Sequence, residues 1–140
     1  MTPVVGRTAD LAACLALRRR VFIEEQGVSE ADEVDGRDGE AVHLLARADG
    51  YPVGCARLLV RGREGKVGRV CVLPDWRGRG IGKALIEAAV ADFLGRGGIG
   101  AVRLGAQVHA LGFYARLGFV AEGSEYLDAG IVHRDMVRRL

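Results

Sequence analysis

Aromatic residues, long hydrophobic runs and cysteine pairs are all scarce in this sequence of 140 residues. Because Phe, Trp and Tyr make up only 6% of the chain, a surface that stacks the bases of single-stranded nucleic acid is not expected. No apolar stretch approaches the roughly 20 residues that a membrane-spanning helix requires. Segment 1–7 lacks the basic start and apolar run of a secretion signal. The sequence therefore predicts a soluble chain that binds neither nucleic acid nor membrane.

Cysteine usage indicates a reducing compartment and no metal site. Cys14, Cys55 and Cys71 are odd in number and show no C-x-x-C spacing, which favours reduced thiols and a cytoplasmic location. The histidines have no metal-ligand spacing with cysteines or carboxylates, so no metal cofactor is expected. A net charge of +2 is too small to indicate an anionic partner by itself.

The start of the chain predicts a helix. Apolar and long residues recur at helical spacing over 11–25, and Arg18 and Glu25 fall on the same stripe as leucine and phenylalanine. Thr8 is a candidate N-cap, and Gly27 suits the C-terminus of the helix. An ion pair between Arg18 and Glu25 on this face is the favoured structural interpretation of both charges.

Segment 29–40 is rich in Asp and Glu and predicts an irregular loop, because Gly36 and Gly39 argue against regular structure. Attraction of a cationic acceptor is one interpretation of its charge. An ordinary solvated loop is the favoured one.

The middle of the chain predicts an antiparallel meander. Strand-like runs cover 41–47, 52–60 and 66–73, and Asp49-Gly50 is a strong signal for a two-residue hairpin. Gly54 within the second run predicts a bulge or a close backbone approach.

The sequence after the meander predicts further helices and strands, which complete a single domain over residues 1–140. It comprises, in chain order, a helix after the glycine-rich stretch 77–82, a strand at 101–106, a helix at 109–117 and strands at 119–121 and 131–137. Antiparallel hairpins followed by a strand–helix–strand segment predict an α+β fold with a mixed, mostly antiparallel sheet and helices on both faces.

The strongest chemical signal is the turn Arg77-Gly78-Arg79-Gly80-Ile81-Gly82 between a strand and a helix. Unpaired N–H groups at a helix N-terminus bind phosphate, and glycine lets the backbone approach an anion closely. A Walker A loop is excluded because Arg77 and Ala84 stand at its required glycine and hydroxyl positions. A dinucleotide-binding motif is excluded because Lys83 stands at its third glycine.

Two motifs together resemble those of the GNAT acyltransferase superfamily. Arg77-x-x-Gly80-x-Gly82 after Val70-x-Val72-x-Pro74 resembles its acyl-CoA-binding motif, and segment 107–119 resembles its second motif. The chain is similar over nearly its whole length to the small bacterial ElaA/YjcF-like branch, through Arg18-x-x-Val21-Phe22-x-x-Glu25-Gln26, Arg69 to Leu73, and Phe119 to His133. The resemblance implies a GNAT-type sheet and acyl-CoA-dependent N-acyl transfer.

The resemblance also implies roles for individual residues. Those implied to bind the CoA moiety are Val70, Cys71 and Val72 through their backbone, Arg77, Gly78, Arg79, Gly80, Ile81 and Gly82 around the pyrophosphate, and Gln107 and Phe113 in the second motif. Tyr114 matches the tyrosine that protonates the departing thiolate. An unperturbed phenol has a pKa of about 10 and is still a proton donor at pH 7.

Amine acylation also needs a proton acceptor. A primary amine with a pKa of about 10 is only about one part in a thousand neutral at pH 7. Glu25, His43 and His133 are the candidate bases, acting directly or through water, and the sequence does not choose among them. For both His43 and His133, the alternative interpretation is a structural role as a packed, hydrogen-bonded side chain.

Strand residues 70–72 offer two further chemical roles. A main-chain N–H of Val70 or Val72 is the candidate for stabilising the oxyanion. Cys71 alternates with the two valines, so it is expected to pack in the sheet and not to carry the acyl group.

Three functions remain open at this stage. The favoured one is an acetyl-CoA-dependent N-acetyltransferase that acts on a primary amine of a small molecule or peptide, with a homodimer expected from the resemblance. The alternatives are a non-catalytic acyl-CoA-binding sensor and a nucleotide-phosphate enzyme. Tyr114 favours the enzyme over the sensor. The absence of a Walker A or dinucleotide-binding motif disfavours the nucleotide-phosphate enzyme.

Overall fold

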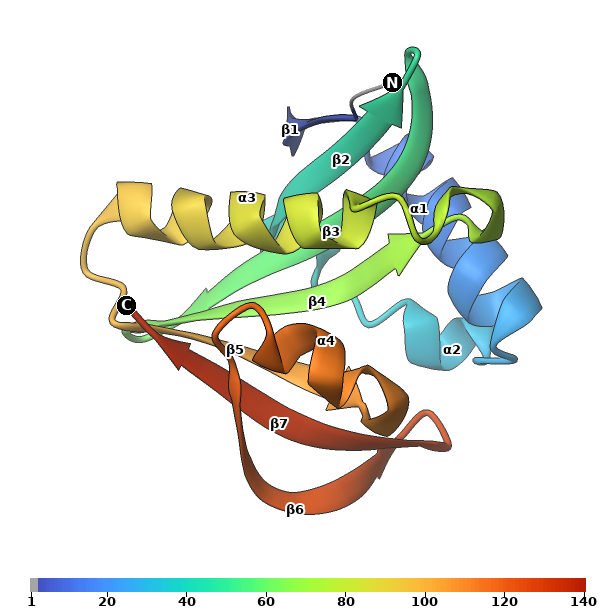
Figure 1. Ribbon diagram of the computed structural model, residues 1–140. Coiled ribbons are helices and arrows are strands. Elements are labelled where there is room, and N and C mark those ends of the chain that lie inside the picture. The colour runs from blue at the N-terminus through green and yellow to red at the C-terminus, as the bar shows by residue number, and fades with distance from the viewer. Residues whose placement is uncertain (1–2) are drawn as a thin grey trace.

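The computed structural model describes residues 3–140 and arranges seven strands in one sheet, in the order β1-β2-β3-β4-β5-β7-β6 (Figure 1). The strands are β1 (Val4–Thr8), β2 (Val42–Ala48), β3 (Tyr51–Arg61), β4 (Glu64–Val72), β5 (Ala101–Gln107), β6 (Val120–Asp128) and β7 (Ile131–Arg139). Neighbouring strands are antiparallel except for the parallel pair β4–β5. The predicted mixed, mostly antiparallel sheet is confirmed.

Helices cover both faces of this sheet, as expected. The helices are α1 (Leu11–Arg18), continued by a π-helical segment (Arg19–Glu25), then α2 (Glu30–Glu33), α3 (Ile81–Arg96) and α4 (Leu111–Ala115), with 3-10 turns at Asp38–Glu40, Pro74–Trp76 and Val108–Ala110. Figure 1 shows α3 and α4 on one face and α1 and α2 on the other. Successive strand residues point to opposite faces, so Leu44 packs in the α3 core and Leu45 in the α1 core.

The parallel pair β4–β5 is short, and this opens the sheet. The two strands pair only where 64–66 faces 101–103, and Figure 1 shows them diverging beyond that point. On its other edge β4 carries an irregularity opposite Ala56, where Arg69 adopts a φ of 52°. A bulge bends its strand and leaves local ladder positions unpaired. The second half of β4 therefore leaves β5 and exposes one backbone edge.

Two glycine signals in the meander are confirmed. Asp49 and Gly50 both have positive φ, 51° and 82°, as a primed two-residue hairpin requires. A Cβ on Gly54 would lie 2.9 Å from the carbonyl oxygen of Cys71, so this glycine permits the close backbone approach that its position predicts.

Three details of the secondary structure differ from the sequence prediction. Segment 29–40 is not wholly irregular, because Ser29 caps helix α2 and a 3-10 turn follows at Asp38–Glu40. Asp10, and not Thr8, caps α1, because Thr8 is still paired in β1 and its hydroxyl accepts the N–H of Asp10. Strand β6 is much longer than 119–121. It lies at the edge of the sheet and is almost wholly exposed, so its polar sequence lacks the alternation that marks a half-buried strand.

No helix within residues 3–140 is long and apolar enough to cross a membrane.

Candidate active site

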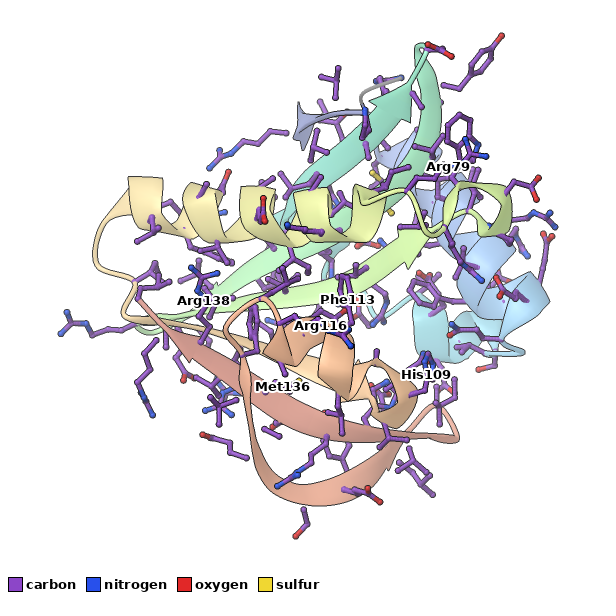
Figure 2. All side chains as sticks on the ribbon, viewed as in Figure 1. Arg79, His109, Phe113, Arg116, Met136 and Arg138 are labelled. Atoms are coloured by element: carbon purple, nitrogen blue, oxygen red, sulfur yellow. The ribbon has the colours of Figure 1, made fainter. Side chains whose placement is uncertain are left out.

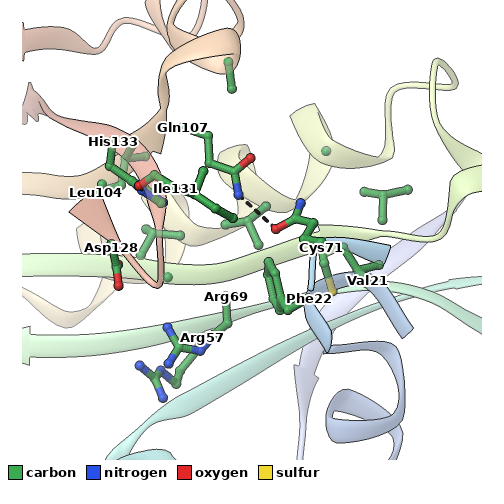
Figure 3. A pocket seen from close by; sticks show the side chains of 18 of the residues that line it. Val21, Phe22, Arg57, Arg69, Cys71, Leu104, Gln107, Asp128, Ile131 and His133 are labelled. Carbon is green, nitrogen blue, oxygen red and sulfur yellow. Dashed lines mark hydrogen bonds between the residues drawn. The ribbon is translucent and has the colours of Figure 1, made fainter. Parts of the chain in front are cut away.

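A cavity of about 1180 Å³ lies where β4 and β5 diverge. Its walls come from the π-helical segment, the loop before α3, helix α4 and the β6–β7 hairpin, so residues from both ends of the chain meet in it. Figure 3 shows Phe22 and Cys71 on one side of this cavity and His133 and Ile131 on the other. The sheet therefore supplies a site that has an exposed strand edge along its wall.

The glycine-rich turn presents free backbone donors to this cavity. Gly78 and Gly80 have φ values of 75° and 81°, which only glycine adopts readily. The first backbone N–H group of α3 that donates a hydrogen bond is that of Ala84, which donates to Gly80 O at 3.0 Å. Among residues 3–140, none accepts a hydrogen bond from the N–H groups of residues 78–83. These free N–H groups lie at the positive end of the dipole of a 16-residue helix, an arrangement that favours an anion.

Side chains around this turn leave its backbone accessible. Ile81 is 2% exposed and points into the α3 core, so it contributes only its N–H group. Arg79 lies over the ring of Trp76 at 4.7 Å from its centroid. Phe113 of α4 lies between α3 and α4 (Figure 2), and a Cβ on Gly82 would lie 3.3 Å from its ring. Gly82 and Phe113 thereby fix the spacing between the two helices.

Of the β4 residues predicted to bind the CoA moiety through their backbone, Val72 lies on the exposed edge of the strand and Cys71 does not. The N–H of Leu73 donates to Val53 O at 2.9 Å, which is a contact with β3. Since the polar groups of successive strand residues point to alternate edges, those of Cys71 face β3 and those of Val72 face the cavity. The Cys71 side chain is 4% exposed and its sulfur lies 3.5 Å from that of Cys55, as expected for packing.

Arg77 and Glu25 form an ion pair that the sequence did not predict. The guanidinium donates to both carboxylate oxygens, at 2.7 and 2.6 Å, and its Nε–H donates to Val72 O at 3.0 Å. The hydrogen bonds from Arg77 hold the pKa of Glu25 below its usual value, although partial burial opposes this. The expected pairing of Glu25 with Arg18 is wrong.

Arg18 is 1% exposed and binds the acidic segment 29–40 instead. Its guanidinium donates to Glu33 and Asp38, while Arg57 pairs with Asp35 at 2.8 Å. The favoured interpretation of 29–40 as an ordinary solvated loop is therefore wrong, because much of its charge is matched by buried arginines. Within residues 3–140, no group of His, Cys, Asp and Glu side chains is arranged to hold a metal ion.

Gln107 links two walls of the cavity. Its Nε2 donates to Gln26 Oε1 at 3.0 Å (Figure 3), and its Oε1 lies 2.8 Å from His109 Nε2. Because an amide oxygen only accepts, His109 is the donor in that contact. The motif that contains Gln26 did not predict its contact with Gln107, because the two residues are 81 positions apart in the sequence.

Tyr114 lies in the cavity wall with its ring between two other aromatic rings. The centroids of Phe113 and Phe119 lie 5.0 and 6.0 Å from its own, both in edge-to-face geometry. Burial raises the pKa of Tyr114 to about 12. The hydroxyl forms no hydrogen bond with residues 3–140, so it is a protonated donor without a protein acceptor.

The two candidate histidines occupy different environments. His43 is 8% exposed, its Nε2 lies 3.0 Å from Asp38 O, and it does not line the cavity. His133 lines the cavity from β7, directly opposite Gln107 of β5. The structure thus brings Tyr114, Glu25 and His133 to one cavity and leaves His43 outside it.

Comparison with known proteins adds to this geometry. Residues 14–140 match the model of a family described as "Acetyltransferase (GNAT) domain". The chain is 36% identical to an N-acetyltransferase of Bacillus subtilis, YjcF, with 99% of each chain covered.

Two solved structures share the fold over almost their whole length. An acyl-CoA N-acyltransferase from Pseudomonas aeruginosa is 35% identical with a TM-score of 0.85, and 98% of each chain is covered. ElaA from Escherichia coli is 28% identical with a TM-score of 0.86, covering 98% of this chain and 99% of its own. The arrangement of strands and helices around the cavity is therefore shared with these proteins.

Proposed function

The chain belongs to the GNAT acetyltransferase family, and from that premise we propose that it transfers an acetyl group from acetyl-CoA to a primary amine of a small molecule or peptide. Family membership makes it an acyltransferase. The proposal names the donor, the acceptor class and the groups that act. The observation that carries it is the meeting, in one cavity, of a glycine-rich turn with free N–H groups, an exposed strand edge and a protonated tyrosine.

The CoA moiety is assigned to the turn and to β4. The free N–H groups of residues 78–83 would bind the pyrophosphate, helped by the dipole of α3. The amide-bearing arm would run along the edge of β4, where the polar groups of Val72 point into the cavity. Arg77 holds this edge through Val72 O and adds positive charge beside the turn.

Tyr114 is assigned as the general acid. The leaving thiolate needs a proton when the C–S bond breaks, and a phenol whose pKa is raised to about 12 by burial carries one throughout the neutral range. A positioned acid of this kind contributes about 10²–10⁴-fold to the rate. The hydroxyl is available because no residue in 3–140 accepts a hydrogen bond from it.

Titration calorimetry with acetyl-CoA, using ATP and NAD as controls, tests the donor assignment. We expect acetyl-CoA to bind selectively with a Kd of about 1 μM to 1 mM, the range of ordinary enzyme substrates. Thiol release with a panel of primary amines then tests turnover. Selective binding of a longer acyl-CoA instead would change only the acyl group.

Two outcomes contradict the proposal. If no CoA compound binds, the turn is not a pyrophosphate site in this chain. If acetyl-CoA binds but neither thiol release nor acetylated product is detected with small amines or peptides, the chain fits the sensor alternative.

A further inference from the structure

The three candidate proton acceptors differ in what their side chains contact. Both carboxylate oxygens of Glu25 accept hydrogen bonds from Arg77, which makes this carboxylate a weak base. His43 lies outside the cavity. Neither residue offers a free basic atom to an amine bound in the cavity.

His133 does offer one. Its Nδ1 lies 2.7 Å from the carbonyl oxygen of Ile131. A carbonyl oxygen only accepts, so Nδ1 carries the proton of the neutral imidazole and Nε2 carries the lone pair. No hydrogen bond within residues 3–140 occupies Nε2. The contact with Ile131 therefore sets the tautomer that leaves the basic nitrogen free.

Tyr126 holds the plane of this imidazole. It is the cross-strand partner of His133, and the two rings are stacked with centroids 5.9 Å apart and planes 19° apart. The tyrosine hydroxyl donates to Asp135 Oδ1 at 2.6 Å. Burial and the Asp135 carboxylate raise the pKa of Tyr126, so this hydrogen bond persists across the neutral range. The phenol is thus fixed at both its ring and its hydroxyl.

Gly105 of β5 makes room for this arrangement. A Cβ at position 105 would lie 2.5 Å from the Tyr126 hydroxyl oxygen and 3.8 Å from Asp135 Oδ1. Any side chain there would collide with the hydroxyl, because real Cβ contacts are essentially never below 3.0 Å. A glycine at this site therefore leaves room over β5 for the hydroxyl while it donates to Asp135 of β7.

We propose, building on the acyltransferase function above, that His133 Nε2 accepts the proton of the acceptor ammonium and that Tyr126 is the positioning residue that holds the imidazole for this step. The ammonium gives one proton to Nε2, and the neutral amine attacks the thioester carbonyl. The C–N bond forms and the C–S bond breaks. The departing sulfur takes a proton from Tyr114. The attacking nitrogen then gives its second proton to the Tyr114 phenolate, and His133 returns its proton to solvent.

The charges around His133 suit this transfer. Gln107 of β5 and Tyr126 of β6 lie directly opposite His133, and the other charged or titratable groups that line the cavity on this side are Asp135, Arg103, Asp128, His109 and Tyr114. The carboxylates of Asp128 and Asp135 add negative charge to the cavity, which attracts an ammonium. Arg103 lies 3.7 Å from Asp135 and offsets part of that carboxylate's charge.

The first test replaces His133 by glutamine, with His43→Gln as the matched control outside the cavity. We expect His133→Gln to lower kcat/KM for the amine about 100-fold at pH 7 and to change the Kd of acetyl-CoA less than about twofold. The deficit should shrink as the pH rises towards the pKa of the amine, because the amine then enters already neutral. His43→Gln should retain kcat/KM within about twofold.

The second test uses the space above Gly105. We expect Gly105→Ala to lower kcat/KM for the amine about tenfold by displacing the Tyr126 hydroxyl, and Tyr126→Phe to lower it about threefold, since the stacked ring remains. The double variant should match Tyr126→Phe alone, because phenylalanine has no hydroxyl for the new methyl group to strike. Thermal melts and the Kd of acetyl-CoA show whether each variant is folded.

Several results would overturn the proposal. An active parent protein whose His133→Gln variant keeps more than about a third of its turnover would remove His133 as the proton acceptor while leaving the acyltransferase function intact. Additive losses in the Gly105→Ala/Tyr126→Phe double variant would remove the positioning role of Tyr126. A parent protein that acetylates no amine would overturn this assignment together with the function on which it rests.

Discussion

The guanidinium of Arg77 and the carboxylate of Glu25 face each other in a two-point ion pair, with N···O distances of 2.7 and 2.6 Å. This contact joins the π-helical segment after α1 to the turn before α3. Since Arg77 Nε–H also donates to Val72 O, one side chain connects the π-helical segment, the exposed edge of β4 and the turn before α3. In the mechanism that we propose, Glu25 therefore supports the architecture of the cavity and His133 is the base.

Replacing Glu25 by glutamine should leave kcat within about threefold and change the KM of acetyl-CoA by about fivefold or less, because ion pairs this exposed are worth about 1 kcal/mol or less. Steady-state kinetics with Glu24→Gln as the control measures this. Glu24 lies one position earlier in the same segment and forms only a long, exposed contact with Arg20. A loss of kcat of two orders of magnitude would instead identify Glu25 as a base.

Replacing Tyr114 by phenylalanine should lower kcat about tenfold or more and leave the Kd of acetyl-CoA almost unchanged, since only the hydroxyl proton is lost. Tyr51→Phe, at an exposed position in the β2–β3 hairpin, is the control. In the parent protein, activity should show no alkaline loss from Tyr114 up to about pH 10, because its pKa is raised to about 12. Equal turnover of the two variants would exclude Tyr114 as the acid.

Replacing Gly80 by alanine should weaken acetyl-CoA binding about tenfold. A non-glycine residue in the left-handed region costs about 1–2 kcal/mol, and Gly80 has a φ of 81° at the start of α3. Gly95→Ala is the matched control, because Gly95 lies within α3 and a Cβ there would have no neighbouring atom within 4 Å. Titration calorimetry compares the two variants, and equal affinities would mean that the turn does not bind the pyrophosphate.

Replacing Asp35 by asparagine should lower the free energy of unfolding at pH 7 by about 2 kcal/mol, because it removes the two-point carboxylate partner of buried Arg57 and leaves only the longer contact with Asp38, at 3.3 Å. The hydrogen bonds from Arg57 hold the pKa of Asp35 far below its ordinary value of 3.8, against the effect of burial. Its stabilisation is therefore complete above pH 3.8 and is lost as the pH falls towards the folded-state pKa. The difference between the parent and the variant should shrink in that range.

Urea unfolding at several pH values measures this difference. Asp32→Asn is the control, since Asp32 is exposed and its carboxylate forms no hydrogen bond or ion pair within residues 3–140. Equal stabilities of parent and Asp35→Asn at pH 7 would show that the ion pairs around segment 29–40 contribute nothing net.

Local sequence patterns were sufficient to predict the order of the strands and of the other helices, the hairpin at Asp49-Gly50 and the turn at 77–82, but not helix α2. These features depend on local chemistry: glycine supplies positive φ, apolar residues repeat with the period of a strand or a helix, and a helix start leaves its N–H groups unpaired. The same local signals placed Tyr114 before Gly118-Phe119 in a recognisable motif. These signals did not predict the full length of edge strand β6, because almost all of it is exposed.

Only the tertiary structure decided which charged and polar side chains meet. Glu25 pairs with a residue 52 positions away and Gln107 with one 81 positions away, whereas Arg18, on the same helical stripe as Glu25, turns to the acidic segment. Such partners depend on how α1 lies across the sheet and where β4 leaves β5, which no local pattern encodes. For the same reason the chain's three candidate bases were equivalent in sequence. The fold distinguishes them, because Glu25 is paired with Arg77, His43 lies outside the cavity and His133 lines it.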